Sequence, residues 1–266
     1  MKLFSRIRHL PLLVFGLLVY LVALVLNFPA ERAYAHWKAS EQASQTFALS
    51  AISGSVWSGK AGVALVKGQM LENLEWSIRP WSLLFGQVGL DWRLQIPAGD
   101  EKTGNYIQAN TALGLDGSVA FSTLEARFPA STIAQLAESG ALRPTGVVNM
   151  NLSDVVWDGQ NLVSANGRVV WQGAGISLLK PLPFGDQSIT LETADKVIKG
   201  VLKDNGGPLS LDGLLTLTAE GKYEFNGNLA ARNAPDLERA LRSLGRPAAD
   251  GRIKFKRSGT LAGLRL

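Results

Sequence analysis

The stretch V-G-L-D-W-R-L-Q-I at residues 88–96 decides the fold of this 266-residue chain. Its apolar side chains, at positions 88, 90, 92, 94 and 96, alternate with glycine, aspartate, arginine and glutamine. Successive side chains of a β-strand point to opposite faces of the sheet, so this period of two places every apolar residue on one face. The stretch therefore predicts a half-buried strand of an antiparallel sheet.

The same alternation recurs along most of the chain, separated by glycine-rich turns. An earlier example is Leu74, Trp76 and Ile78, and later ones begin near residues 124, 148, 169, 189, 215, 223 and 253. There are 28 glycines, and turn signals recur at intervals of about 8 to 12 residues, which is typical of a sheet of about ten or more strands. We therefore predict a mostly β fold, a large curved antiparallel sheet with few short helices.

Two of the few predicted helices occupy corresponding places in the chain. Pro129 opens a helical segment that stops at Gly140, and Pro235 opens one that stops at Gly245. Each is followed by a further glycine and a strand, and the two units lie about 105 residues apart. This repetition predicts a sheet built from two similar halves that divide near residue 145. The alternative is that proline and glycine simply punctuate any helix.

The segment at residues 10–28, LPLLVFGLLVYLVALVLNF, is apolar except for Tyr20 and Asn27. At a helical rise of about 1.5 Å per residue, it would extend over about 30 Å, the thickness of the hydrocarbon core of a bilayer. It predicts one N-terminal transmembrane helix. The alternative is a cleaved signal peptide, because Ala33-Tyr34-Ala35 has the small-x-small form that a signal peptidase recognises.

The charges beside this segment predict its orientation. Lys2, Arg6 and Arg8 precede it without an acidic residue, so we expect the N-terminus in the cytoplasm and the main domain across the membrane. The predicted parts are a cytoplasmic tail at 1–9, a transmembrane helix at 10–28, a juxtamembrane helix and linker at 29–50, a first β half at 51–145 and a second β half at 146–266.

Composition argues against nucleic-acid binding and catalysis. The formal net charge is +5, but three positive charges belong to the N-terminal tail, so the rest is nearly neutral and offers no match to a phosphate backbone. The chain has no cysteine, and its two histidines, His9 and His36, flank the apolar segment. The main domain therefore lacks thiolate ligands and an imidazole base, and we predict no enzyme activity and no cofactor.

Tryptophan and glycine are concentrated between residues 54 and 92. The segments GSVWSGKA at 54–61 and LEWSIRPWSLLFG at 74–86 predict a three-stranded start to the sheet, with residues 80–86 as a connecting turn. The tryptophans are either core residues or an apolar surface that contacts a partner or lipid. The candidate contact residues are Trp57, Trp76, Trp81 and Trp92, of which Trp57, Trp76 and Trp92 are predicted on strands, and the motif glycines are Gly54, Gly59 and Gly86.

These segments resemble a known family. The pattern G-x-V-W-x-G-x-A after an N-terminal apolar segment, followed by x-L-x-W-x-[IL]-x-P-x-x-L-L-x-G, is similar to the type II secretion system protein N family, also called general secretion pathway protein N. The resemblance implies a single-pass protein of the bacterial inner membrane with a periplasmic domain. It implies an accessory role in the export of folded proteins across the outer membrane. We expect other type II secretion system subunits to dock on its sheet edges and tryptophan-rich start, and no catalytic residue is carried over.

A weaker likeness is to the AsmA-like proteins, which also have one N-terminal span and repeated antiparallel strands and are implicated in outer-membrane lipid homeostasis. It implies a lipid-binding or lipid-transfer module of the cell envelope as the alternative function. An apolar-faced sheet could enclose a groove for acyl chains or bury that face as a filled core. Both arrangements produce the same alternation, so the sequence leaves both open.

Overall fold

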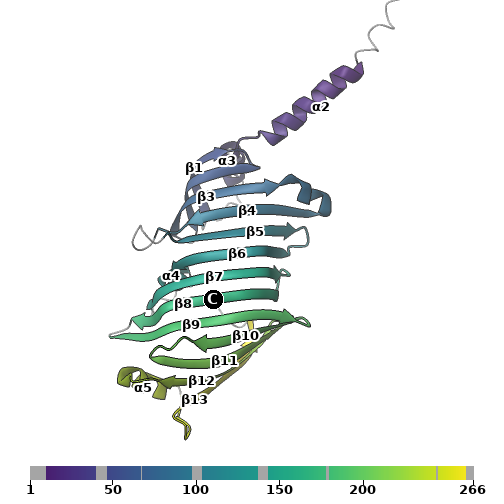
Figure 1. Ribbon diagram of the computed structural model, residues 1–266. Coiled ribbons are helices and arrows are strands. Elements are labelled where there is room, and N and C mark those ends of the chain that lie inside the picture. Colours follow the sequence, from purple (N-terminus) through teal and green to yellow (C-terminus); the bar gives the residue numbers. More distant parts are fainter. Residues whose placement is uncertain are drawn as a thin grey trace, which may run out of the picture.

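The computed structural model describes residues 10–39, 47–66, 68–97, 104–136, 143–177, 180–243 and 245–261. Within them the chain forms one 13-stranded sheet, whose strands lie side by side in sequence order (Figure 1). Every neighbouring pair is antiparallel. This arrangement confirms the predicted mostly β, antiparallel fold.

The strands form a continuous meander, because antiparallel neighbours can be joined by short turns. They are β1 (Phe47–Gly54), β2 (Ser58–Val66), β3 (Gln69–Arg79), β4 (Gln87–Gln95), β5 (Tyr106–Gly114), β6 (Val119–Pro129), β7 (Arg143–Trp157), β8 (Leu162–Ser177), β9 (Pro181–Ala194), β10 (Val197–Asp204), β11 (Leu209–Thr218), β12 (Lys222–Ala231) and β13 (Ile253–Thr260). The sheet begins at Phe47, inside the segment 29–50 for which the sequence predicted helix and linker.

Helices are few, as predicted. They are α2 (Leu10–Leu26), α3 (Ala30–Ala39), the 3₁₀ helix η1 (Pro80–Phe85), α4 (Ser131–Leu136) and α5 (Pro235–Arg242). α4 and α5 lie where the two prolines predicted helices, although residues 137–140 of the first predicted segment lie outside the described residues. Residue 145 lies inside β7, which pairs with both β6 and β8, so the sheet is continuous there. The division into two similar halves stays a prediction.

α2 is shorter than the apolar segment that predicted it, because the helix ends at Leu26 and not at Phe28. Pro29 disfavours a helical conformation at the residue before it, and the Asn27 side chain donates a hydrogen bond to the Ala23 carbonyl at 2.8 Å. Among the described residues, no helix is both long enough and apolar enough to cross a membrane. The predicted transmembrane helix at 10–28 is therefore not confirmed.

The register of the sheet gathers apolar side chains on one face. Direct partners on the five successive strands β4 to β8 are Leu94, Ile107, Ala126, Met150 and Val169. Met150 and Val169 pack against both of the larger core clusters, so the apolar core is continuous from β3 to β12. This part of the core is a layer of apolar side chains on one face of the sheet.

The opposite face carries polar side chains in a matching row. Direct partners on the same five strands are Arg93, Gln108, Glu125, Asn151 and Arg168. This row is displaced by one residue from the apolar row, as the period of two around Trp92 predicted. One face of the sheet is therefore polar and the other apolar.

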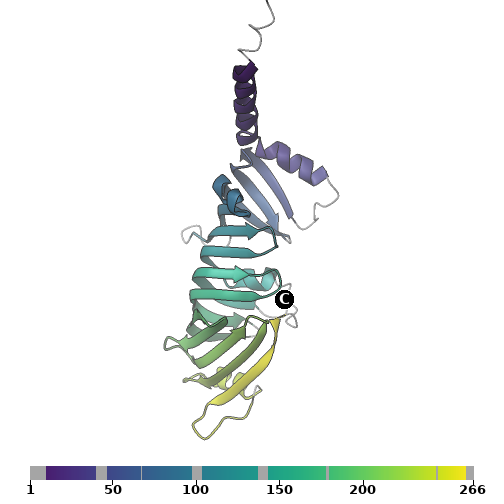
Figure 2. The ribbon, with the colours of Figure 1, turned by 90° about the vertical axis from the view of Figure 1, so that its right-hand side faces the viewer.

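α3 packs at the first strand and α5 against the last ones, and Figure 2 shows α3 beside the start of the sheet. The Tyr34 hydroxyl of α3 accepts a hydrogen bond from the Leu49 amide of β1 at 2.8 Å. Leu237 and Leu241 of α5 are buried in a separate apolar cluster with side chains of β9, β11, β12 and β13. Together these helices shield apolar side chains at the two ends of the sheet.

An ionic network joins the last hairpins. Asp204, at the end of β10, pairs with Arg232, directly after β12. The Asp204 carboxylate also accepts hydrogen bonds from the amides of Gly206 at 2.9 Å and Leu211 at 3.1 Å. The hydrogen bond from Arg232 is the main cause that lowers the pKa of Asp204 to about 2. The ionised carboxylate is therefore part of the folded structure.

Replacing this carboxylate should lower stability in a pH-dependent way. Because the pKa of Asp204 is lower in the folded chain than its ordinary value of 3.8, its ionisation stabilises the fold above that value, and this contribution disappears as the pH falls toward 2. After allowance for solvent screening, Asp204→Asn should lower the free energy of unfolding at neutral pH by on the order of 1 kcal/mol. Urea unfolding at neutral pH and at a pH of about 2.5 measures the difference, which should shrink at the lower pH.

The control is Asp236→Asn, which removes an exposed ion pair with Arg239 inside α5. It should change the free energy of unfolding less than Asp204→Asn at neutral pH, because exposed pairs contribute little. A loss for Asp204→Asn that is the same at both pH values would contradict the assignment.

Candidate functional site

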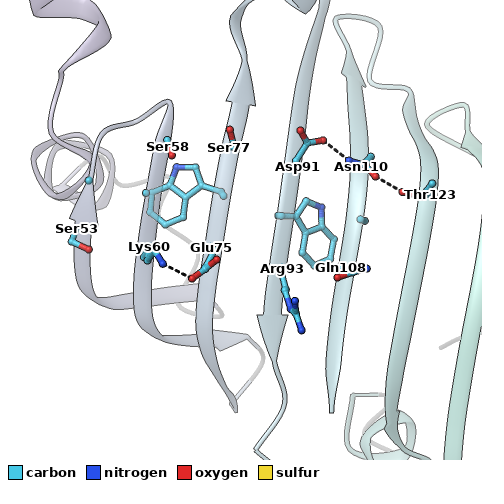
Figure 3. A pocket seen from close by; sticks show the side chains of 15 residues that line it. Ser53, Ser58, Lys60, Glu75, Ser77, Asp91, Arg93, Gln108, Asn110 and Thr123 are labelled. Atoms are coloured by element: carbon cyan, nitrogen blue, oxygen red, sulfur yellow. Dashed lines mark hydrogen bonds and ion pairs between the residues drawn. The ribbon is translucent and has the colours of Figure 1, made fainter. Parts of the chain in front are cut away.

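A polar groove lies across the first strands of the sheet, on the face opposite the apolar core. It has a volume of about 590 Å³ and is open to solvent. Strands β2, β3 and β4 contribute Lys60, Glu75, Asp91 and Arg93, and β5 contributes Asn110 (Figure 3). They share a face because Lys60 is opposite Glu75, and Glu75 is opposite Arg93, in the register of the sheet.

Three of the four charged side chains that line the groove form ion pairs: Lys60 and Glu75 with each other, and Asp91 with Arg79, which does not line the groove. The Lys60 ammonium nitrogen lies 2.6 Å from a Glu75 carboxylate oxygen, and an Arg79 guanidinium nitrogen lies 3.5 Å from Asp91. The hydrogen bond from Lys60 is the first cause that lowers the pKa of Glu75. The groove therefore suits hydrogen bonding to a polar segment better than attraction of a strongly charged ligand.

Further contacts fix the side chains in the middle of the groove. Asn110 donates a hydrogen bond to Asp91 at 2.6 Å, and the Thr123 hydroxyl donates to the side-chain oxygen of Asn110. The Arg93 guanidinium carbon lies 5.3 Å from the centre of the Tyr106 ring. This ordering precedes any ligand and so reduces the entropy lost on binding. These residues were not among the predicted contact residues, although the polar positions of the alternating strands could have indicated them.

Trp76 of β3 and Trp92 of β4 are direct partners, on strands as predicted. Both are half-buried, and Trp92 packs against the apolar core. Their ring N–H groups have partners inside the chain, since Trp76 donates to the Val56 carbonyl at 3.0 Å and Trp92 to the Thr111 hydroxyl at 2.9 Å. They hold together the strands that form the groove.

Trp57 does not lie on a strand, contrary to the prediction. It lies in the turn between β1 and β2, which closes where the Ser55 amide donates to the Ser58 carbonyl at 2.8 Å. The Trp57 ring N–H donates to the Val25 carbonyl in the last turn of α2 at 2.9 Å, and its own carbonyl accepts from the Ile78 amide of β3 at 2.6 Å. Trp57 thereby connects α2 to the start of the sheet.

Two motif glycines explain the spacing in G-x-V-W-x-G. Gly54 has φ +87°, a conformation that favours glycine, and it begins the turn that contains Trp57. At Gly59, a Cβ atom would lie 2.4 Å from Cζ2 of Trp76 and 2.8 Å from the Ser53 carbonyl oxygen. The pattern therefore provides a tight turn and room for the Trp76 ring.

The predicted connection at residues 80–86 folds as η1. Pro80 stands at its first turn, and Gly86 ends it in the left-handed conformation at φ +69°. η1 has no buried residue, and the side chains of Trp81, Leu84 and Phe85 are 77%, 76% and 81% exposed. The four candidate tryptophans therefore lie in three settings: Trp76 and Trp92 on paired strands, Trp57 in the turn between β1 and β2, and Trp81 exposed on η1.

A second, apolar hollow lies on the last strands of the sheet and has a volume of about 320 Å³. Its lining residues come from β11, β12, β13 and the residue after β13, and they are Leu215, Leu217, Tyr223, Phe225, Phe255, Arg257 and Leu261. The apolar alternation here was predicted, and it left open whether the apolar face forms a groove or a filled core. All but one of these side chains are aromatic or aliphatic, so the hollow can accommodate an apolar chain.

The arrangement of titratable groups is that of structural ion pairs and turns. In the part of the chain that the structure describes, no three His, Cys, Asp or Glu side chains are grouped so that they could hold a metal ion. The pKa of Glu224 is lowered first by its hydrogen bond from Lys256, and that of Asp116 by its hydrogen bond from Ser118. A lowered pKa makes a carboxylate a weaker base, and the causes of these shifts are local hydrogen bonds at exposed positions.

The profile of the family described as "Type II secretion system (T2SS), protein N" matches residues 45–256. The type II secretion system protein N of Aeromonas hydrophila is 23% identical to this chain over 251 residues, which cover 92% of this chain and 96% of the relative. The type II secretion system protein N of Vibrio cholerae serotype O1 is 24% identical over 255 residues, which cover 93% of this chain and 98% of the relative. No solved structure matches the chain.

The matched residues begin just before β1 and end inside β13, and they include the groove, Trp57 and η1. They make up well over half of the chain. The chain therefore belongs to the type II secretion system protein N family.

Proposed function

We propose that this chain is an accessory component of the type II secretion system, and that it works in the cell envelope in the export of folded proteins across the outer membrane. The support is the family match over residues 45–256 and the likeness to two type II secretion system N proteins over at least 92% of this chain. The proposed role is structural: the sheet binds other subunits and catalyses no reaction.

α2 is the proposed attachment to the inner membrane, with the sheet in the periplasm. Its 17 residues are nearly all apolar, and side chains such as Leu12, Leu13 and Phe15 are 67%, 69% and 64% exposed. A helix of about 17 residues is at the short end of the range for membrane-inserted helices. The basic residues before it favour a cytoplasmic N-terminus.

Two arginines in α2 should release the chain from the membrane. Val14→Arg with Leu18→Arg places both charges on one face, and each charge costs about 2.5–3.5 kcal/mol at the centre of a bilayer. The retained fraction after alkaline carbonate extraction should fall by at least about tenfold. The matched control is Leu214→Arg at a 45% exposed position of β11, which should leave retention unchanged. Equal membrane retention of the double variant and the original chain would contradict the proposed membrane attachment through α2.

The polar groove is the single observation that carries partner binding. It is open, its side chains are ordered before binding, and it lies within the residues that match the family. Its paired charges, such as Lys60 with Glu75, offer donors and acceptors in a fixed pattern. In the proposal, a polar segment of another type II secretion system subunit docks across β2, β3, β4 and β5.

Exchanging one charge pair tests this docking. The double variant Lys60→Glu with Glu75→Lys keeps an ion pair between β2 and β3 but reverses the charge pattern that a partner meets. Because both side chains are at least half exposed, the melting temperature should change little. Secretion of a type II substrate should fall by about tenfold, since reversed charges oppose a complementary partner.

The matched control exchanges Lys256 and Glu224, a cross-strand pair of similar exposure at 2.8 Å between β12 and β13. This variant should support normal secretion. If the folded variant with the exchange at 60 and 75 also supports full secretion, docking in the groove is wrong.

The apolar hollow favours a second candidate function, a lipid-binding or lipid-transfer module. Its lining is aromatic and aliphatic apart from Arg257, whose positive charge suits the head group of an anionic lipid. An acyl chain in the hollow would remove apolar surface of Leu215 and Phe255 from water.

This candidate predicts about one acyl lipid for each full-length chain purified in mild detergent, as measured by native mass spectrometry with lipid extraction. Leu215→Arg should lower the retained lipid severalfold, because it places a charge in the apolar hollow. The control Val201→Arg, at a 42% exposed position of β10, should not. A lipid-free original chain would count against this function.

A further inference from the structure

We propose that η1 and the neighbouring side chain of Leu115 form a second membrane contact, which seats the start of the sheet on the lipid interface beside α2. We name the surface of Trp81, Leu84, Phe85 and Leu115 the apolar tip. The inference rests on the proposed membrane attachment of α2 and adds a second contact to it.

The apolar tip is unusual in how much of it faces water. Trp81, Leu84 and Phe85 are at least 76% exposed, and Leu115, in the turn between β5 and β6, is 86% exposed. A Cβ atom placed at Gly86 would lie 3.9 Å from Leu115 Cδ1, so the two connections are neighbours. Large apolar side chains grouped in this way mark a contact surface.

Hydrogen bonds place the apolar tip at the same end of the sheet as α2. Trp57 accepts from the Ile78 amide at 2.6 Å, only two residues before η1 begins, and donates to the Val25 carbonyl of α2 at 2.9 Å. The Val56 amide also donates to the Phe28 carbonyl at 3.0 Å, directly after α2. In Figure 1, α2 and the short helix between β3 and β4 both extend toward the right-hand side of the sheet.

The chemistry of the apolar tip matches a lipid interface. Tryptophan is favoured at the level of the head groups, because its ring is apolar and its N–H can meet polar groups. Leu84, Phe85 and Leu115 carry no polar atom in their side chains and can enter the acyl region. Because α2 and the apolar tip lie at the same end of the sheet, a bilayer that contains α2 would also be available to the tip. A protein partner would be an additional molecule. The lipid interface is therefore the occupant that the structure favours.

The absence of cysteine from the chain allows the test to use single labels. An NBD fluorophore on Phe85→Cys of the full-length chain is measured in vesicles of phosphatidylethanolamine and phosphatidylglycerol, with and without nitroxide-labelled lipid. Val19→Cys reports whether α2 enters the bilayer, and Val201→Cys on β10 is the matched control, at 48% and 42% exposure respectively. Leu84→Cys repeats the measurement at a second position of the tip.

We expect nitroxide lipid to quench the labels at 19 and 85 at least about twofold more than the label at 201. Quenching at 19 but not at 84 or 85 would overturn the second contact and leave the attachment of α2 intact. Quenching at 85 alone would support the contact and reject α2 as the attachment. No quenching at either position would reject both. A blue-shifted label at 85 in vesicles that nitroxide lipid does not quench would overturn the lipid contact in favour of a protein surface.

Discussion

The cross-strand register is the constraint on which the rest of the molecule depends. Because side chains alternate along each strand, a shift by one residue would move Leu94 to the solvent face and Arg93 into the core. The described residues form one sheet, so among them no second sheet could cover the apolar side chains that such a shift would expose. Local irregularities are confined to bulges, such as the one at Gly146 in β7, where a Cβ atom would lie 2.3 Å from the Gln172 carbonyl oxygen.

The two edges of the sheet are protected in different ways. α3 packs at β1, and the last strand, β13, carries the exposed basic side chains of Lys254, Lys256 and Arg257. A row of like charges on an edge strand opposes pairing with another strand. The charges therefore disfavour the addition of a strand from another molecule at β13. Of the two contact regions expected from the sequence, the sheet edges and the tryptophan-rich start, the proposed groove keeps the second, because it lies across the strands of that start.

Local alternation is enough to predict the places of Trp76 and Trp92, because the parity of one strand decides which face a side chain joins. It cannot place Trp57, whose partner Val25 lies 32 residues away, in a helix and not in a strand. The exposure of Trp81 depends on where the connection between β3 and β4 lies relative to the sheet. The same local sequence would be compatible with a buried Trp81, so the sequence could not predict its exposure. Alternation predicts which side chains lie on the apolar face of the sheet, but not how closely they pack there. The hollow near Phe255 therefore could not be predicted from the sequence.

Trp57 makes the orientation of α2 a property of the sheet. The last carbonyls of a helix have no partner inside it, and the Trp57 ring N–H meets one of them while the Trp57 carbonyl meets β3. Each such hydrogen bond contributes about 0.5–1.5 kcal/mol to stability. Tilting α2 away from the sheet would break them together, so they resist this motion. A membrane that holds α2 would then also fix the groove and η1, which lie on the same first strands. The hollow is lined by residues of β11, β12 and β13, the strands at the opposite end of the sheet from α2 in Figure 1, so docking of subunits and binding of an acyl chain would not compete for one surface.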